Sequence, residues 1–162
     1  MDQPSLRALY VGTERFTLGV MLLALPLFGL VYLVFNSGRL PKNLPQLSPA
    51  LIWGLVLILL VLLGFQYWTF FQRIKKTLSL ESLEDKVKEY VRATRQRYLY
   101  LFLVSLGSTA GLLFSGNPAF IFIFAITLVF FSLGKPTSDR MARLLKLKKE
   151  DRELLREVSR PI

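Results

Sequence analysis

Four long apolar runs without a charged side chain constrain this chain more than any other feature of its sequence. They contain no Lys, Arg, Asp or Glu, and they cover Phe16–Phe35, Ala50–Phe71, Tyr98–Phe114 and Pro118–Gly134. A bilayer core is about 30 Å thick and takes roughly 20 helical residues to cross. The first two runs reach that length, and the last two, at 17 residues each, lie near its lower limit. We therefore predict an all-α polytopic membrane protein with four transmembrane helices.

A soluble, buried helical bundle is the alternative to a membrane protein. Of the 162 residues, 52% are hydrophobic, and the core of a soluble fold this small rarely sustains four charge-free runs of such length. We expect a single membrane domain over residues 1–162. The segment before the first run is mixed in charge and no small-x-small cleavage site follows, so we expect this run to be a span and not a signal peptide.

The basic residues predict an orientation. Of the 21 Lys and Arg residues, 19 lie in the N-terminal segment, the second loop and the tail, which share one side of a four-span protein, and only Arg39 and Lys42 lie on the other side. Positively charged loops stay in the cytoplasm. We therefore expect a multi-pass protein of the inner cell membrane with both termini in the cytoplasm.

The loops divide the four spans into two helical hairpins. The first hairpin has a loop rich in Pro, Gly, Asn and Ser, and the second has the tight turn Ser-Gly-Asn-Pro, in which Gly116 or Asn117 can take a positive φ. Pro26 lies within the first span, where the missing amide hydrogen and the clash with the preceding turn predict a kink.

Two amphipathic segments are predicted on the cytoplasmic side. Residues 79–97 show apolar positions at helical spacing and no breaker before the third span, so we expect one helix from about Ser82 to Phe114. The basic tail, residues 135–162, carries a second apolar stripe after a cap at Thr137 or Ser138. The tail can lie on anionic lipid or pack on the stripe of the 79–97 helix, and we favour packing.

The motif with the clearest meaning inside the spans is a GxxxG pattern. Gly107 and Gly111 lie on one helix face with Ser108 beside them, and small residues allow two helix backbones to approach closely. Three partners are open for this face: a span of the same chain, which we favour, a second copy, or another membrane protein.

A basic surface is expected where the spans meet the cytoplasm. Anionic lipid headgroups or an acidic partner would contact residues near the ends of the second, third and fourth spans, namely Arg73, Lys75, Lys76, Arg95, Arg97, Lys146, Lys148 and Lys149. The net charge of +10 is concentrated at span ends, so we expect no nucleic-acid partner.

Residues typical of catalysis are few in this sequence. The chain has no Cys and no His, which excludes disulfides, thiolate chemistry and His-ligated metals. Asp85 and Glu89 share a helix face, but a solvated surface explains them better than a metal site or an acid–base pair. We therefore predict no catalytic residue, no metal site and no cofactor.

Part of the chain resembles a known group of proteins. The stretch SLEDKVKEYVRATRQRYLYLFLVS, the turn SGN and the motif KPTSDRMARLLKLK, which together lie within residues 79–148, are similar to small four-span membrane proteins of bacteria of the Bacteroidota. The resemblance implies a bacterial inner-membrane location, and it implies no activity or functional residue.

Three functions fit this architecture to different degrees. The favoured hypothesis is an accessory or scaffold protein that acts by helix packing and a basic cytoplasmic face. The second is a small channel or transporter formed by several copies, which would use the Pro26 kink and the Ser/Thr-lined third span. An enzyme is least favoured, since it would depend on cytoplasmic carboxylates such as Glu84 and Glu89.

Overall fold

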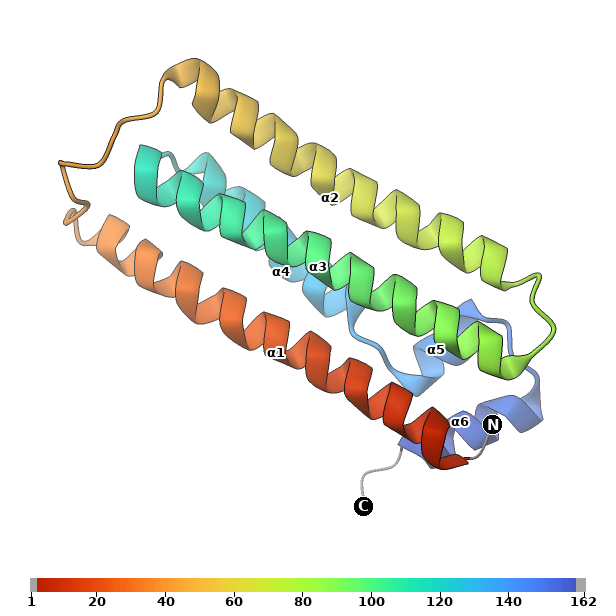
Figure 1. The fold of residues 1–162 in the computed structure, drawn as a ribbon. Helices are drawn as coiled ribbons and strands as arrows, with labels where there is room; N and C mark the ends of the chain where they lie inside the picture. The colour runs from red at the N-terminus through yellow and green to blue at the C-terminus, as the bar shows by residue number, and fades with distance from the viewer. Residues whose placement is uncertain (1–2, 160–162) are drawn as a thin grey trace.

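The computed structural model describes residues 3–159, in which every regular element is an α-helix (Figure 1). The helices are α1 (Gln3–Asn36), α2 (Pro49–Thr77), α3 (Leu83–Ser115), α4 (Ala119–Gly134), α5 (Ser138–Leu144) and α6 (Lys149–Ser159). Residues 1–2 and 160–162, including Arg160 of the predicted tail, lie outside the described residues. The predicted all-α class is confirmed.

Three helices are long and apolar enough to cross a membrane, and these are α1, α2 and α3. The fourth, α4, has 16 residues, which makes it about 24 Å long at about 1.5 Å per residue. It reaches the length of a span only together with α5, from which an 84° bend separates it. The chain therefore has three to four candidate spans. The predicted span 118–134 corresponds to α4, which is the shortest of α1 to α4.

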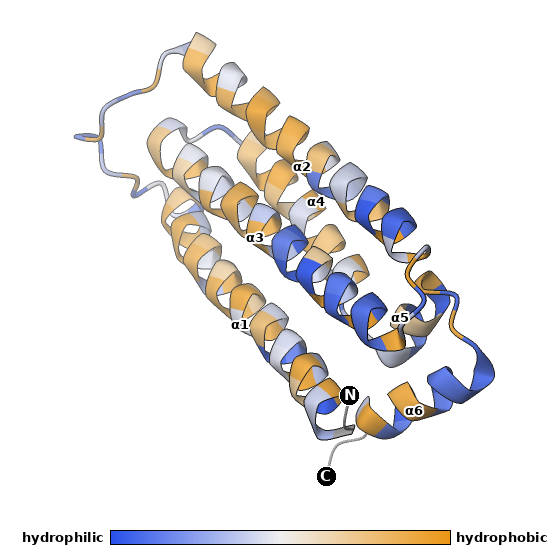
Figure 2. Ribbon diagram, turned by 45° about the vertical axis from the view of Figure 1, so that its right-hand side comes forward, coloured by the Kyte–Doolittle hydropathy of each residue, from blue (hydrophilic) through white to orange (hydrophobic). Residues whose placement is uncertain are grey.

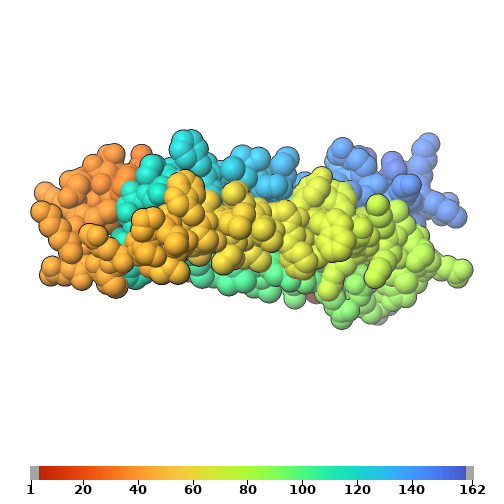
Figure 3. Space-filling view, turned by 90° about the horizontal axis from the view of Figure 1, so that it is seen from above, coloured from red at the N-terminus to blue at the C-terminus, as the bar shows by residue number. Residues whose placement is uncertain are grey.

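The central helix of the bundle is α3. It lies between α1 and α2, and α4 packs against it from behind (Figure 1). Seen from above, the molecule is long and narrow, and its C-terminal helices gather at one end (Figure 3). As predicted, α3 runs without a break through the amphipathic segment and the third apolar run. It begins at Leu83 and not at residue 79, because Ser79 belongs to the turn after α2, where its hydroxyl donates to the Lys76 carbonyl.

Local chemistry explains where the helices begin and end. The Ser48 hydroxyl accepts from the Leu51 amide at 3.4 Å, and Pro49 follows in the first turn of α2, where its missing N–H costs no helical hydrogen bond. At the other end of the bundle, Gly116 ends α3 with a φ of 59°, a left-handed conformation that glycine adopts without steric cost. The Asn117 side chain then accepts from the Ala119 amide at 2.9 Å to start α4.

The half of the bundle that contains the four charge-free runs, which we name the apolar half, has a tightly packed interior and an apolar exterior. Phe28 of α1 and Phe124 of α4 stack with their ring centroids 3.7 Å apart, and Leu101, Val104 and Leu112 of α3 are fully buried. Figure 2 shows that hydrophobic residues predominate in this half of the helices. Large exposed side chains there include Leu22, Leu30, Leu57 and Phe122. Such a surface is typical of helices that face lipid.

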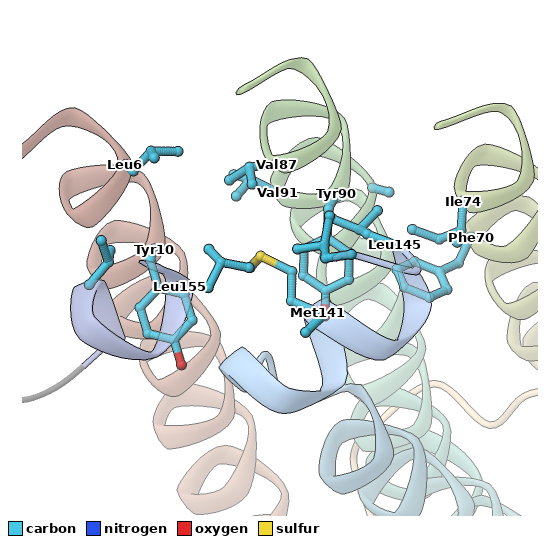
Figure 4. Packing of buried hydrophobic residues seen from close by; sticks show 14 residues of the cluster. Leu6, Tyr10, Phe70, Ile74, Val87, Tyr90, Val91, Met141, Leu145 and Leu155 are labelled. Atoms are coloured by element: carbon cyan, nitrogen blue, oxygen red, sulfur yellow. The ribbon is translucent and has the colours of Figure 1, made fainter. Parts of the chain in front are cut away.

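A second core lies at the other end of the bundle. We name this end the polar end and define it as residues 3–15, 70–97 and 135–159. Side chains of α1, α2, α3, α5 and α6 converge there (Figure 4). This polar-end core consists of Leu6, Tyr10, Phe70, Ile74, Val87, Tyr90, Val91, Ala93, Met141, Ala142, Leu145, Leu147, Leu155 and Val158. The tail thus packs on the stripe of the 79–97 segment, as the sequence analysis favoured.

The first turns of α1 are a part of the fold that sequence analysis did not anticipate. The predicted span began at Phe16, whereas α1 begins at Gln3. Its buried residues Leu6, Tyr10, Thr13 and Thr17 follow one another at intervals of three or four, the spacing of a helical stripe. The Tyr10 hydroxyl also donates to the Pro136 carbonyl at 3.4 Å. These contacts attach the start of α1 to the tail.

Candidate functional site

Most of the basic residues predicted to contact lipid or a partner lie on the surface of the polar end. Arg73 is half-buried, and six side chains are exposed, namely Lys75, Lys76, Arg95, Lys146, Lys148 and Lys149. Arg95 lies beside α1, with its guanidinium carbon 5.9 Å from the centroid of the Phe16 ring. Figure 2 shows the hydrophilic residues of α2, α3 and α6 collected at this one end.

The prediction that Arg97 is a surface contact is wrong. Its side chain is only 2% exposed, because α3 turns it toward α2, where its guanidinium carbon lies 5.0 Å from the centroid of the Phe70 ring. The aromatic face offers the cation a favourable electrostatic contact. Its Nε and Nη1 atoms have no hydrogen-bond partner among the described residues.

The burial of Arg97 leaves positive charge inside the protein without a carboxylate beside it. None of the ion pairs found within residues 3–159 includes Arg97. Arg140 of α5 is close enough to act electrostatically on it as a second cation. Burying a charge without a counter-charge is costly. Arg97 is therefore a buried cation on which a second cation acts, without a carboxylate in an ion pair with it among the described residues.

Tyr98, the next residue of α3 after Arg97, holds the end of α4 in place. Its hydroxyl donates to the Phe131 carbonyl at 2.8 Å, and thereby satisfies one of the carbonyls that the last turn of a helix leaves without a partner. Gly134 lies against the Tyr98 ring, and a Cβ atom there would come within 3.1 Å of it. Because Gly134 has no side chain, the backbone can pass close to the Tyr98 ring before the chain bends into α5.

Gln66 of α2 is a buried amide without a partner. It is 0% exposed, and neither its Nε2 nor its Oε1 atom has a hydrogen-bond partner within the described residues. The sequence analysis singled out no role for this residue. A buried amide without a hydrogen bond destabilises a fold, so Gln66 is a strained position in the packing of α2.

A surface cavity of about 450 Å³ lies where α4 bends into α5. It is lined by Ser132, Lys135, Thr137, Arg140, Arg143 and Leu144. Sequence reasoning counted its three basic residues only toward the orientation of the chain. Lys135 follows the last apolar run directly, and Arg140 and Arg143 are three residues apart on one helix, which is the signal that would have grouped them.

Two of the three acidic residues of α3, Glu84 and Glu89, pair with basic neighbours on the helix surface. Lys88 donates to Glu84, and Arg92 donates to Glu89 at 2.9 Å. Such i,i+3 and i,i+4 pairs stabilise exposed helices. Within residues 3–159, no group of three or more His, Cys, Asp or Glu residues is placed to hold a metal ion.

The two glycines of the GxxxG pattern face different helices of the same chain. A Cβ atom at Gly107 would lie 2.6 Å from Leu59 of α2, and one at Gly111 would meet three atoms of the Phe120 ring of α4 at under 3.0 Å. Ser108, between them, is fully buried and donates to the Val104 carbonyl at 2.9 Å. The small residues of α3 thus accommodate α2 and α4.

Pro26 lies on the surface of α1, where its side chain is exposed. The helix continues on both sides of it, from Gln3 to Asn36.

Comparison of the chain with protein-family models, with curated proteins and with solved structures finds no match.

The glycine contacts predict unequal effects of added methyl groups. We expect Gly111→Ala to lower the free energy of unfolding by about 1–3 kcal/mol, since the rigid Phe120 ring must move, and Gly107→Ala to cost less, since only the end of the flexible Leu59 side chain is in the way. Thermal unfolding in mild detergent measures both. Gly64→Ala is the matched control, because a Cβ atom there meets nothing within 4 Å. Equal stability of Gly111→Ala and Gly64→Ala would contradict the packing described.

The unpaired amide of Gln66 predicts a stabilising substitution. Gln66→Leu removes two buried polar atoms and keeps a similar volume, so we expect the free energy of unfolding to rise by about 1–3 kcal/mol. Chemical or thermal unfolding in mild detergent measures the change. Gln72→Leu, at an exposed position of the same helix, serves as the control and should change stability little. Destabilisation by Gln66→Leu would mean that the amide has a partner.

Proposed function

We propose that this chain is an integral membrane scaffold or accessory protein that holds a rigid basic platform against the inner surface of a bacterial cell membrane. The observation that carries the proposal is the polar-end core, in which the ends of α1, α2 and α3 pack with α5 and α6. The packing makes the polar end and the apolar half one continuous body through α3.

The proposed topology has four spans in two hairpins and both termini in the cytoplasm. It is supported by the charge-free runs and by the 19 basic residues on one side against two on the other. In this arrangement α4 is the fourth span, and α5 lies along the membrane surface after the 84° bend. The polar-end core is then the cytoplasmic layer.

The scaffold role is favoured over a channel within one chain by the packing of the bundle. The Phe28 and Phe124 rings stack in the interior of the apolar half, and Phe120 and Phe131 are fully buried nearby. The platform, in contrast, offers exposed cations such as Lys75, Lys76 and Lys148. These suit anionic headgroups or an acidic surface of a membrane-protein partner or a second copy.

The topology predicts opposite accessibility of two loop positions. The chain has no Cys, so a single introduced cysteine reports only its own site. In intact cells, a membrane-impermeant maleimide should label Asn43→Cys in the first loop and should leave Lys148→Cys unlabelled until the cells are lysed. The reverse pattern, or labelling of both variants in intact cells, would contradict the proposed orientation.

The scaffold role predicts a complex that depends on the basic platform. After extraction in mild detergent, we expect the protein to elute in a stoichiometric complex with itself or with another membrane protein. The variant Lys75→Glu/Lys76→Glu/Lys148→Glu should lose most of that complex, because it replaces attraction by repulsion. Arg39→Glu/Lys42→Glu reverses the charge of the first loop and should leave the complex intact. Elution of the wild type as a lone chain would refute the role.

A further inference from the structure

The cavity at the α4–α5 bend has the electrostatics of an anion site. Three of its six lining residues are cations, namely Lys135, Arg140 and Arg143, and none is acidic. The neighbouring carboxylate of Asp139 is engaged by Arg156, with its Oδ1 atom 3.0 Å from the Arg156 Nη2 atom. The hydroxyl groups of Ser132 and Thr137 also line the cavity and provide neutral hydrogen-bonding groups for an oxyanion.

A buried cation outside the cavity adds to the positive charge around Arg140. The buried Arg97 side chain has no carboxylate partner in the described part of the chain, and Arg140 acts on it electrostatically. A negative charge bound beside Arg140 would lower the repulsion between these two arginines. The cavity therefore lies where the fold itself has an excess of positive charge.

An apolar surface adjoins the cavity along α4. Phe122, Ile126, Val129 and Leu133 are exposed by between 42% and 70%, and their spacing of three or four residues places them on one face of the helix. The last of them, Leu133, neighbours Ser132 of the cavity wall. This apolar stripe of α4 thus leads away from the basic cavity in the direction of the bilayer core.

We propose that the cavity binds the phosphate headgroup of an anionic phospholipid, whose acyl chains lie along the apolar stripe of α4. The charge-free run of α4 ends at Gly134 and Lys135 follows immediately, which places the cavity at the headgroup level of the membrane. Lysines and arginines at that level attract anionic lipid. The combination of a basic cavity with an adjoining apolar stripe fits an amphiphile, whereas a soluble phosphate would use the cavity alone.

The inference rests on the proposed embedding in a membrane and not on the proposed scaffold role. Loss of the complex in the platform variant would concern the role alone, because that variant leaves Lys135, Arg140 and Arg143 unchanged. Conversely, lipid binding can fail in a protein that still forms its complex.

Native mass spectrometry of the protein in mild detergent tests the site with three probes: dioleoylphosphatidylglycerol, dioleoylphosphatidylcholine and soluble glycerol phosphate. We expect one molecule of phosphatidylglycerol to bind at least about tenfold more tightly than phosphatidylcholine, given three cations at the site. Glycerol phosphate, which has no acyl chains, should bind much more weakly than phosphatidylglycerol.

Two triple variants, each of which loses three positive charges, distinguish lipid binding at the cavity from diffuse attraction of anionic lipid to the basic surface. Lys135→Gln/Arg140→Gln/Arg143→Gln should lower the affinity for phosphatidylglycerol to that for phosphatidylcholine. The control Lys86→Gln/Lys88→Gln/Arg92→Gln changes three half-buried or exposed cations of α3 elsewhere on the polar end and should change the affinity less than about twofold. Thermal unfolding verifies that both variants are folded.

Three results would overturn the proposal. Equal losses in the two triple variants would assign the binding to surface charge in general. Equal affinity of the wild type for the two lipids would remove the anion site, and this comparison needs no variant. Glycerol phosphate binding as tightly as phosphatidylglycerol would make the cavity a soluble phosphate site.

Discussion

The close packing of three helices around α3 is the constraint on which the rest of the structure depends. In a bilayer, helices gain little from hiding apolar surface from one another, so close contact between backbones and side chains must hold them together. Small residues on α3 allow that contact, as Gly107 does for Leu59 and Gly111 does for Phe120. The nearby hydroxyl groups do not obstruct it, since Ser108 and Thr109 donate to carbonyls of their own helix.

The same helix joins two parts of the molecule that differ in chemistry. In its apolar half α3 packs through residues such as Leu101 and Val104, and at the polar end it packs through Val87, Tyr90 and Val91. Arg97 lies between the two cores as a buried charge, and Tyr98, which belongs to the core of the apolar half, holds the end of α4. A displacement of the polar end would therefore act on α4 through the Tyr98–Phe131 hydrogen bond, because a continuous helix transmits motion along its axis.

Sequence patterns predicted the parts of the fold that depend on local chemistry. Charge-free runs located the long helices, and the lack of a breaker predicted the continuous α3. Of the two cap candidates Thr137 and Ser138, Thr137 is the cap of α5, where its hydroxyl accepts from the Arg140 amide. The parts that depend on tertiary contacts were missed. Leu6 and Tyr10 belong to a segment of mixed charge, and their apolar stripe is buried only because the tail packs on it. Arg97 was expected at the surface because the Phe70 ring beside it is 27 residues away in the sequence. The basic cavity forms only because an 84° bend brings α5 next to the end of α4.

The contact between the tail and the start of α1 sets an order on assembly. Leu6 and Tyr10 leave the ribosome well before their partners, which are Leu155, Val158 and the Pro136 carbonyl. During synthesis the apolar stripe at the start of α1 therefore stays uncovered until α5 and α6 have been made. Closure of the polar-end core is then a late step of folding, because it needs residues from both ends of the bundle's helix order.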